Sequence, residues 1–220
     1  MRRFWNFDSG DGERILRLDG PIAEETWWGD EITPAAFRRE LFARKGDLTV
    51  WINSPGGDVF CAAQIYNMLK EYPGSVTVKI DGIAASAASV VAMAGGKVFM
   101  SPVSCMMIHN PATIEAGDGA EMLRAKAMLD EVKESIINAY QGKTGQAREA
   151  ISAMMDAETW MNAHKAVELG FADGILYEEP SVNNAGKMYQ SVSVTNSLLN
   201  KISRQQPVDV YIDRLNKLHH

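Results

Sequence analysis

Several features that define whole classes of protein are scarce in this sequence. Cysteine occurs twice in 220 residues, and Cys61 and Cys105 lie in apolar stretches without CxxC or histidine-rich spacing. Two cysteines in such surroundings suggest neither a disulfide framework nor a zinc site, and we expect no metal and no cofactor. We expect both thiols to be buried and reduced, serving as small hydrophobic side chains.

Basic residues are in the minority. Lysine and arginine number 22 and aspartate and glutamate number 28, which gives a formal charge of -6. Proteins that bind nucleic acid neutralise phosphates with clustered basic side chains, and this balance argues against such a surface. We therefore expect no nucleic-acid partner.

Long hydrophobic runs are missing as well. One uncharged stretch, residues 82–96, consists mostly of alanine, serine, glycine and valine, and it is shorter and less apolar than a membrane span of about 20 residues. Residues 1–3 include two arginines but lead into Trp5 and Asp8 without the apolar segment of a secretory signal. We expect a cytoplasmic protein with no membrane partner.

Two segments of the chain share a pattern of strand, turn and helix. Residues 48–52 form an apolar strand that stops at a Pro-Gly-Gly turn, and apolar residues then recur at helical spacing through residues 59–69. Residues 75–80 form a β-branched strand, followed at Gly82 by small residues and by a second helix from about Ser86. The sequence therefore predicts an α/β fold.

The composition divides the chain into a body and a tail. Apolar residues make up 46% of the sequence, which is ample for one main domain. After Tyr177 the sequence becomes polar and weakly patterned. We predict one domain over residues 1–178 and a tail or small appendage over residues 179–220.

A long helix is predicted in the second half of the body. Asp118 and Glu121 have the spacing of a capping box, and an apolar line follows them at helical spacing. We expect Gly142 to break this helix and Thr144 to cap a shorter one that runs to about Met155.

Ser86 stands where a turn of small residues meets the start of an apolar helix. That position exposes the hydroxyl and aims the first helical N–H groups at a developing oxyanion. An isolated serine of this kind usually only caps a helix. A nucleophilic role requires three more parts: a general base, a residue that orients the base, and a second oxyanion donor.

The chain offers four histidines as the base. His219 and His220 are terminal, and His164 lies on an amphipathic helix where a surface position is expected. His109 ends the apolar run 105–108, so a strand delivers its imidazole to a strand end, where sites are built. Imidazole titrates at about 6.5, which suits a base working near neutral pH, although a lone histidine here could also be structural.

Three segments that carry these residues follow one another in the chain: 53–57 (NSPGG), 82–86 (GIAAS) and 107–111 (MIHNP). A fourth segment, 166–173, reads AVELGFAD. In order and spacing, the four resemble the proteolytic subunit of the Clp proteases. The likeness covers roughly residues 45–177 and is far more specific than any one motif.

The resemblance implies a fold of repeated strand-strand-helix units shared with the crotonase superfamily, and acyl transfer through a seryl ester. It implies that Ser86 is the nucleophile and His109 the base. It also implies that the N–H groups of Gly57 and Ala87 are the oxyanion donors. Three residues would bind the substrate: Gly56, Gly57 and Pro111.

The third member of the triad has two candidates. In the Clp family an aspartate precedes an aromatic-x-Ser-Ala segment, and aligning residues 160–163 (WMNA) without a gap puts Glu158 at that place. Asp156 lies two residues earlier, on the same face of an extended segment. We favour Glu158 and keep Asp156 as the alternative.

Segments near the N-terminus resemble a narrower group, the Clp-related proteases of phage and prophage head-assembly modules. The likeness lies in residues 4–7 (FWNF), 16–20 (LRLDG), 27–30 (WWGD) and 58–60 (DVF). It implies a bacterial or prophage-encoded protease that trims capsid or scaffold precursors. The wider family implies self-association into a ring-shaped homo-oligomer, for which we expect residues 118–140 to form the ring-stacking helix.

Four other readings compete with this one. A degradative peptidase would work with a separate ATP-dependent AAA+ unfoldase, since the chain has no phosphate-binding loop of its own. A crotonase-type acyl-coenzyme A enzyme would use paired oxyanion donors without a serine nucleophile. A signal-peptide peptidase would need a lysine base, for which Lys79 and Lys97 are the nearby candidates. An inactive ring subunit would have the same fold but no catalytic activity.

Overall fold

We analysed a computed structural model of the chain, which describes residues 3–8, 14–23 and 34–178. Residues Met1–Tyr177 form one compact unit. The predicted tail at 179–220 and the segment 27–30 lie outside the described residues.

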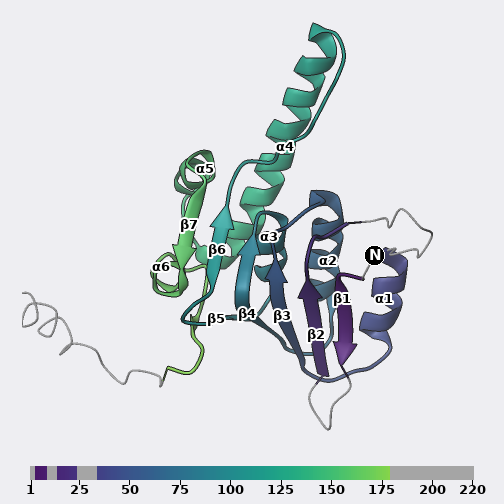
Figure 1. The fold of residues 1–220 in the computed structure, drawn as a ribbon, viewed down its shortest axis with the longest axis vertical. Coiled ribbons are helices and arrows are strands. Elements are labelled where there is room, and N and C mark those ends of the chain that lie inside the picture. Colours follow the sequence, from purple (N-terminus) through teal and green to yellow (C-terminus); the bar gives the residue numbers. More distant parts are fainter. Residues whose placement is uncertain (1–2, 9–13, 24–33, 179–220) are drawn as a thin grey trace, which may run out of the picture. The chain divides into compact units, whose positions relative to one another are not determined.

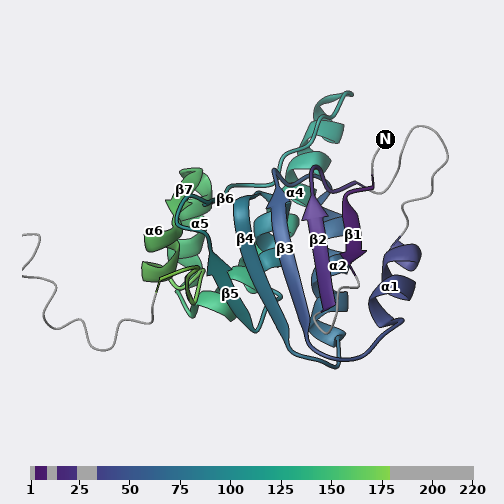
Figure 2. The same cartoon turned by 60° about the horizontal axis from the view of Figure 1, so that its bottom comes forward.

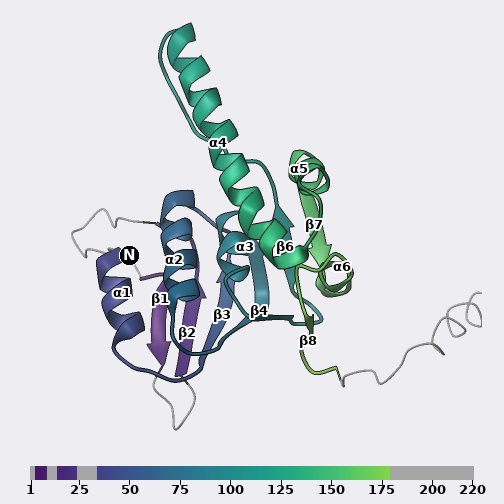
Figure 3. The same cartoon turned by 180° about the vertical axis from the view of Figure 1, so that it is seen from behind.

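The unit is built on one sheet, in which the strand order is β1-β2-β3-β4-β5-β8. Figures 1 and 2 label β1 to β5, and Figure 3 labels β8. β1 pairs with β2 in the antiparallel sense, and the remaining neighbours along this path are parallel. Parallel strands require crossover connections, and helices provide most of these here. The bounds of the six strands are Trp5–Asp8, Arg14–Asp19, Leu48–Ser54, Val76–Ala85, Lys97–Met100 and Gly174–Ile175.

The longest strand, β4, has two different neighbours on its outer side. Its first half pairs with β5, and its last three residues pair in parallel with β6 (Cys105–Ile108). β6 in turn pairs with the antiparallel strand β7 (Thr159–Asn162). The carboxyl ends of β4 and β6 therefore lie side by side.

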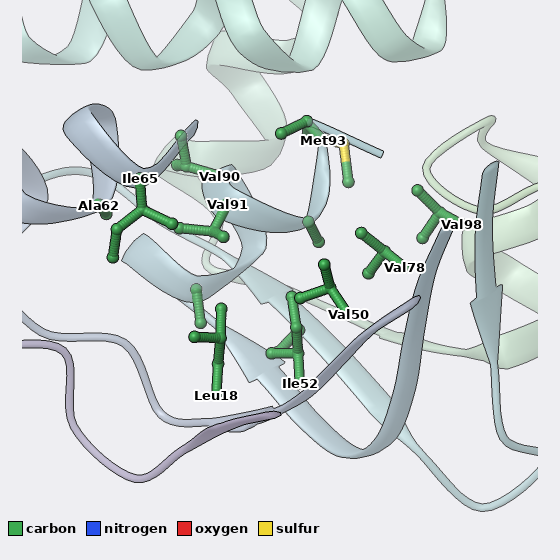
Figure 4. Close-up of a cluster of buried hydrophobic side chains, with 14 of the residues drawn as sticks. Leu18, Val50, Ile52, Ala62, Ile65, Val78, Val90, Val91, Met93 and Val98 are labelled. Carbon is green, nitrogen blue, oxygen red and sulfur yellow. The ribbon is translucent and has the colours of Figure 1, made fainter. Parts of the chain in front are cut away.

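Helices α2 (Val59–Glu71) and α3 (Ala87–Ala92) cover one face of the sheet (Figure 3). Alternate strand residues such as Val50, Ile52 and Val78 are fully buried against them, as the twofold repeat of a strand requires. Figure 4 shows these side chains beside Ile65 of α2 and Val91 of α3. This core supports the strand ends at which the site is built.

The remaining helices are α1 (Pro34–Phe42), α4 (Gly119–Thr144), α5 (Arg148–Asp156) and α6 (Ala163–Glu168). The predicted capping box of α4 is confirmed, since the Asp118 side chain accepts from the Glu121 N–H and the Glu121 side chain accepts from the Asp118 N–H. The α/β fold and the first strand-turn-helix segment are confirmed as well. In the second segment the predicted turn at Gly82 was wrong, because β4 continues through Gly82 to Ala85 beside β6 and the chain turns only at Ser86, before α3.

Two predicted helix boundaries were wrong. α4 continues through Gly142 and ends at Thr144, capped by Gly145 with φ at 69°. A glycine inside a helix costs only about 1 kcal/mol, so Gly142 alone does not end it. Thr144 does not cap the next helix, because its hydroxyl donates to the Tyr140 carbonyl and α5 begins after Ala147.

Only the last part of α4 packs on the body of the unit, and its first part projects away from the sheet (Figures 1 and 3). The buried residues of α4 are Ile136, Ile137, Ala139 and Tyr140. Within the described ranges, no helix has the length and apolar character needed to cross a membrane. The expectation that both cysteines are buried holds for Cys61 but not for Cys105, which is half-buried.

Candidate active site

Ser86 lies at the end of β4, where the chain turns into α3. Its N–H donates to the Met107 carbonyl of β6 over 2.9 Å, so the serine is tied to the neighbouring strand. Its φ is 54°, a conformation that a residue other than glycine adopts only when its surroundings impose it. Such strained junctions of strand and helix expose a nucleophile above a sheet.

His109 directly follows β6, the strand to which Ser86 is bonded. The His109 Nε2 atom lies 2.7 Å from the Ser86 Oγ atom, which is hydrogen-bonding distance. When Nδ1 has the ring proton, Nε2 accepts the serine hydroxyl proton, as a general base does. The structure thus brings together the two residues that the sequence analysis paired.

The glycine turn after β3 packs directly against Ser86. Gly56 has φ at 97°, and a Cβ added to it would lie 2.6 Å from the Ala85 carbonyl oxygen and 2.8 Å from the Ser86 Cβ atom. No other residue fits that space. Gly57 forms an isolated parallel bridge with Ile22, which holds the turn from the other side.

Ala87 is the first residue of α3, so its N–H has no acceptor within the helix. It lies on the wall of a cavity of about 280 Å³ together with Gly57, Ser86, His109 and Pro111. Five of the predicted site residues therefore meet at one cavity. Gly56 is buried behind it.

The rest of the cavity wall is largely apolar. Its side chains come from α2, α3 and the middle of α4, and they include Val59, Val90, Leu129, Val132 and Ile136. A second hollow of about 710 Å³ between α2 and α4 shares several of these residues. The nucleophile thus lies at one end of an extended apolar groove.

The two candidate carboxylates have other partners in this structure. The Asp156 carboxylate accepts from Asn110 over 2.8 Å and from Lys133 over 2.6 Å, and these bonds, that of Lys133 foremost, lower the pKa of Asp156. The Glu158 carboxylate accepts from the Trp160 indole N–H over 3.1 Å. Within the described part of the chain, neither is hydrogen-bonded to His109.

The strand register nevertheless places Glu158 close to the base along the backbone. Ile108 of β6 is paired with Thr159 of β7 in the antiparallel sense. The pairing ends there, so His109 and Glu158 are the next residues beyond the last pair on the two sides of the ladder, both outside the regular strands. Glu158 has φ at 48°, so the regular strand conformation begins only after it. The identity of the third triad member stays a prediction.

Other candidates from the sequence lie apart from the cavity. His164 is exposed on α6. Lys79 is stacked over the Trp51 ring at 5.3 Å, and neither it nor Lys97 is among the residues that line the cavity. Across the described residues, no group of three or more histidine, cysteine, aspartate or glutamate side chains is arranged to bind a metal ion.

The family model for Clp protease matches residues 11–179, which is most of the chain. The chain belongs to the Clp protease family. Membership of this family implies that the chain is a peptidase, a hydrolase of peptide bonds.

Individual Clp relatives agree with this assignment. The chain is 38% identical to "ATP-dependent Clp protease proteolytic subunit 1" of Chlamydia muridarum over 173 residues, which covers 76% of this chain and 88% of the relative. It is 33% identical over 141 residues to the proteolytic subunit 2 of Thermobifida fusca, covering 63% and 70% of the two chains. It is 30% identical to the subunit of Ligilactobacillus salivarius, covering 77% and 86%.

Sequence reasoning missed two hydroxyls close to the backbone of the nucleophile. Ser89 Oγ lies 2.6 Å from the Ser86 carbonyl oxygen and 2.7 Å from the Tyr140 hydroxyl. Both side chains are buried. The contact joins residues 51 positions apart, and no local pattern signals such a pair.

Proposed function

We propose that this chain is a serine endopeptidase in which Ser86 is the nucleophile and His109 the general base. The observation that supports the proposal most strongly is the 2.7 Å contact between Ser86 Oγ and His109 Nε2 at the wall of the cavity. Serine peptidases on unrelated folds are recognised by this geometry.

The reaction would begin when the Ser86 oxygen attacks the carbonyl carbon of a peptide bond and His109 takes the hydroxyl proton. The N–H groups of Gly57 and Ala87 would donate to the oxyanion that forms, and each such donor accelerates serine peptidases by roughly 100 to 1000-fold. His109 then returns the proton to the leaving amine, and water hydrolyses the seryl ester by the reverse path.

The tautomer of His109 that serves as base has its proton on Nδ1 and requires an acceptor there. We propose that Glu158 is this acceptor, with Asp156 as the alternative. The register of β6 and β7 supports Glu158, and the bond between Asp156 and Asn110, the neighbour of His109, supports Asp156. Either carboxylate would leave its present partner to reach the imidazole.

The peptide backbone would lie along the glycine turn and Pro111, with one side chain directed into the groove. Gly57 and Pro111 line the cavity, and Gly56 keeps the turn against Ser86. Because the wall is formed by aliphatic side chains such as Val132 and Ile136, an apolar residue before the cleaved bond would be preferred.

Self-association into a ring-shaped homo-oligomer is the quaternary structure that we propose. Three large apolar side chains, Met122, Leu123 and Met128, are exposed on the projecting part of α4, and Leu123 is 70% exposed. Clustered exposed apolar residues are typical of protein interfaces. A second copy of the chain covering this part of α4 would bury them.

Two biological roles fit the proposed chemistry. The names of the relatives, which describe ATP-dependent proteolytic subunits, favour a degradative peptidase that works with a separate AAA+ unfoldase. Trimming of phage capsid or scaffold precursors is supported only by the N-terminal segments noted in the sequence. Degradation of a folded substrate that requires both ATP and an added unfoldase would establish the first role. Cleavage of a capsid precursor by the chain alone would establish the second.

The chemistry is tested by labelling with a fluorophosphonate, which reacts with activated serines. We expect the purified protein to be labelled at Ser86 and to hydrolyse a peptide ester. Ser86→Ala should abolish labelling and lower turnover by about five to six orders of magnitude, as loss of a triad serine does. An unlabelled wild-type protein, or a Ser86→Ala variant that still hydrolyses the ester, would contradict the proposal and favour a crotonase-type enzyme or an inactive ring.

A further inference from the structure

A pair of buried, hydrogen-bonded hydroxyl groups lies close to the backbone of the nucleophile, and one of the two residues, Tyr140, also lines the cavity. Tyr140 comes from the end of α4 and is 1% exposed, and Ser89 comes from α3 and is fully buried. Their oxygen atoms are 2.7 Å apart. The reaction proposed above uses neither side chain.

The direction of the two hydrogen bonds follows from the groups involved. A carbonyl oxygen only accepts, so the Ser89 hydroxyl donates to the Ser86 carbonyl over 2.6 Å. The remaining hydrogen of the pair belongs to Tyr140, whose hydroxyl therefore donates to Ser89 Oγ. Burial raises the pKa of Tyr140, which favours the protonated phenol that this bond requires.

The acceptor of this chain of bonds is the carbonyl of the nucleophile itself. The Ser89 N–H also donates to it, over 2.9 Å, so the Ser86 carbonyl oxygen has two donors. That carbonyl and the Ala87 N–H belong to the same planar peptide unit and point in opposite directions. Whatever holds the carbonyl therefore also fixes the direction of the N–H of Ala87, a residue that lines the cavity.

The same bonds strengthen the N–H as a donor. Hydrogen bonds to a carbonyl oxygen polarise the whole peptide group, and this cooperative effect is largest where the dielectric constant is low. The peptide unit also follows the strained φ of 54° at Ser86, which requires support from its surroundings.

We infer that Tyr140 and Ser89 are positioning residues that orient and polarise the Ala87 oxyanion donor through the Ser86 carbonyl. The inference rests on the proposed function, because it assumes that an oxyanion forms at Ala87. It adds this role of the end of α4 to the lining of the cavity, to which Tyr140 also contributes.

The experiment compares two substrates that differ in one atom, a peptide oxoester and the matching thionoester. Sulfur is a weak hydrogen-bond acceptor, so the thionoester depends less on the oxyanion donors. Tyr140→Phe and Ser89→Ala should each lower kcat for the oxoester by about 10-fold, less than the 100 to 1000-fold loss of a whole donor. KM should stay unchanged, and the ratio of oxoester to thionoester rates should fall by a similar factor.

Tyr72→Phe is the matched control. Tyr72 is also buried, and its hydroxyl donates to the Gly46 carbonyl over 2.9 Å at the other end of the strands, before β3 begins. Removing this hydroxyl should lower Tm through the lost hydrogen bond and leave the ratio of the two rates at the wild-type value.

The inference is overturned if Tyr140→Phe and Ser89→Ala reduce both ester rates equally, or lower Tm without changing the ratio. If Tyr140→Phe fails to fold, Ser89→Ala gives the same test, since it removes the hydroxyl that contacts the carbonyl. A wild-type protein that neither hydrolyses the esters nor reacts with a fluorophosphonate would defeat the proposed function as well. A wild type that does both, with an unchanged ratio in the variants, defeats this inference alone.

Discussion

Ser86 and His109 follow two strands that are hydrogen-bonded to each other in the sheet, whereas Asp156 is the exposed last residue of α5 and Glu158 lies in the exposed connection from α5 to β7. The first pair is held by buried backbone and is already in contact at 2.7 Å. The second pair is bonded to Lys133, Asn110 and Trp160 instead of the imidazole. The core of the sheet thus aligns nucleophile and base without help from the carboxylate.

In this comparison the largest effect is expected from replacing the carboxylate that orients His109. It tests whether that carboxylate is Glu158 or Asp156. Glu158→Gln should lower kcat by about 10,000-fold, because the amide no longer stabilises the required tautomer and the imidazolium, as in other triads. Steady-state kinetics on a peptide ester measures the change. Sedimentation of the same variant should show unaltered assembly.

Asp156→Asn is the paired variant for that measurement. It should leave kcat within a few-fold of wild type if Glu158 is the orienting group. Near-normal activity of Glu158→Gln together with an inactive Asp156→Asn would transfer the role to Asp156.

A substitution in the glycine turn that packs against Ser86 is expected to have an intermediate effect on activity. Gly56→Ala places a Cβ 2.6 Å from the Ala85 carbonyl and forces alanine to a φ of 97°. The turn must shift, so we expect the fluorophosphonate labelling rate to fall by about 100-fold, the lower end of the loss of one oxyanion donor. The strain should also lower the free energy of unfolding by about 1 to 3 kcal/mol.

Gly142→Ala provides the control for a glycine substitution. Gly142 lies inside α4 with open space at the Cβ position. Alanine is the better helix former there, and this variant should gain about 0.5 to 1 kcal/mol in stability and keep its labelling rate. Equal labelling rates in the two glycine variants would show that the turn does not position the site.

The smallest expected effect concerns the ion pair between Lys133 and Asp156, one of the two exposed carboxylates. The hydrogen bond from Lys133 is the main cause that lowers the pKa of Asp156. A carboxylate with a lowered pKa stabilises the fold above its ordinary value, and this contribution is lost as pH falls through the lowered value. Lys133→Met should therefore cause a small decrease in Tm at neutral pH.

The difference in Tm between Lys133→Met and the wild type should shrink at acid pH, which thermal unfolding across the range from pH 7 down to the acid limb can measure. A difference that stays constant with pH would show that the charge of Asp156 has no part in it. Turnover at pH 7 should be unchanged, unless Asp156 is the group that orients His109.

The sequence alone predicted those features that depend on residues close together in the chain. The helix start at Asp118 follows from a capping box, and the strand before Ser86 follows from β-branched residues. The pairing of Ser86 with His109 came from the resemblance to a family, because periodicity does not give the order of strands. In the structure, the pairing of β4 with β6 brings these two residues together.

Features that depend on distant contacts could not be read from the sequence. Strands β1, β5 and β8 are short, and they are stabilised by pairing with neighbouring strands. Their sequence patterns are therefore weak. The end of α4 at Thr144 was misplaced because glycine occurs at both 142 and 145, and only the second has a positive φ. The partners of Asp156 come from α4 and from the loop after β6, since Lys133 and Asn110 are 23 and 46 positions away in the chain.

The two ends of α4 are subject to different structural constraints. Tyr140 lies in the last turn but one, enclosed by the body of the unit, while the first turns of the helix leave the sheet behind (Figure 3). The projecting end could therefore change in length or in surface residues, and with it the self-association proposed above, without altering the bond between Tyr140 and Ser89.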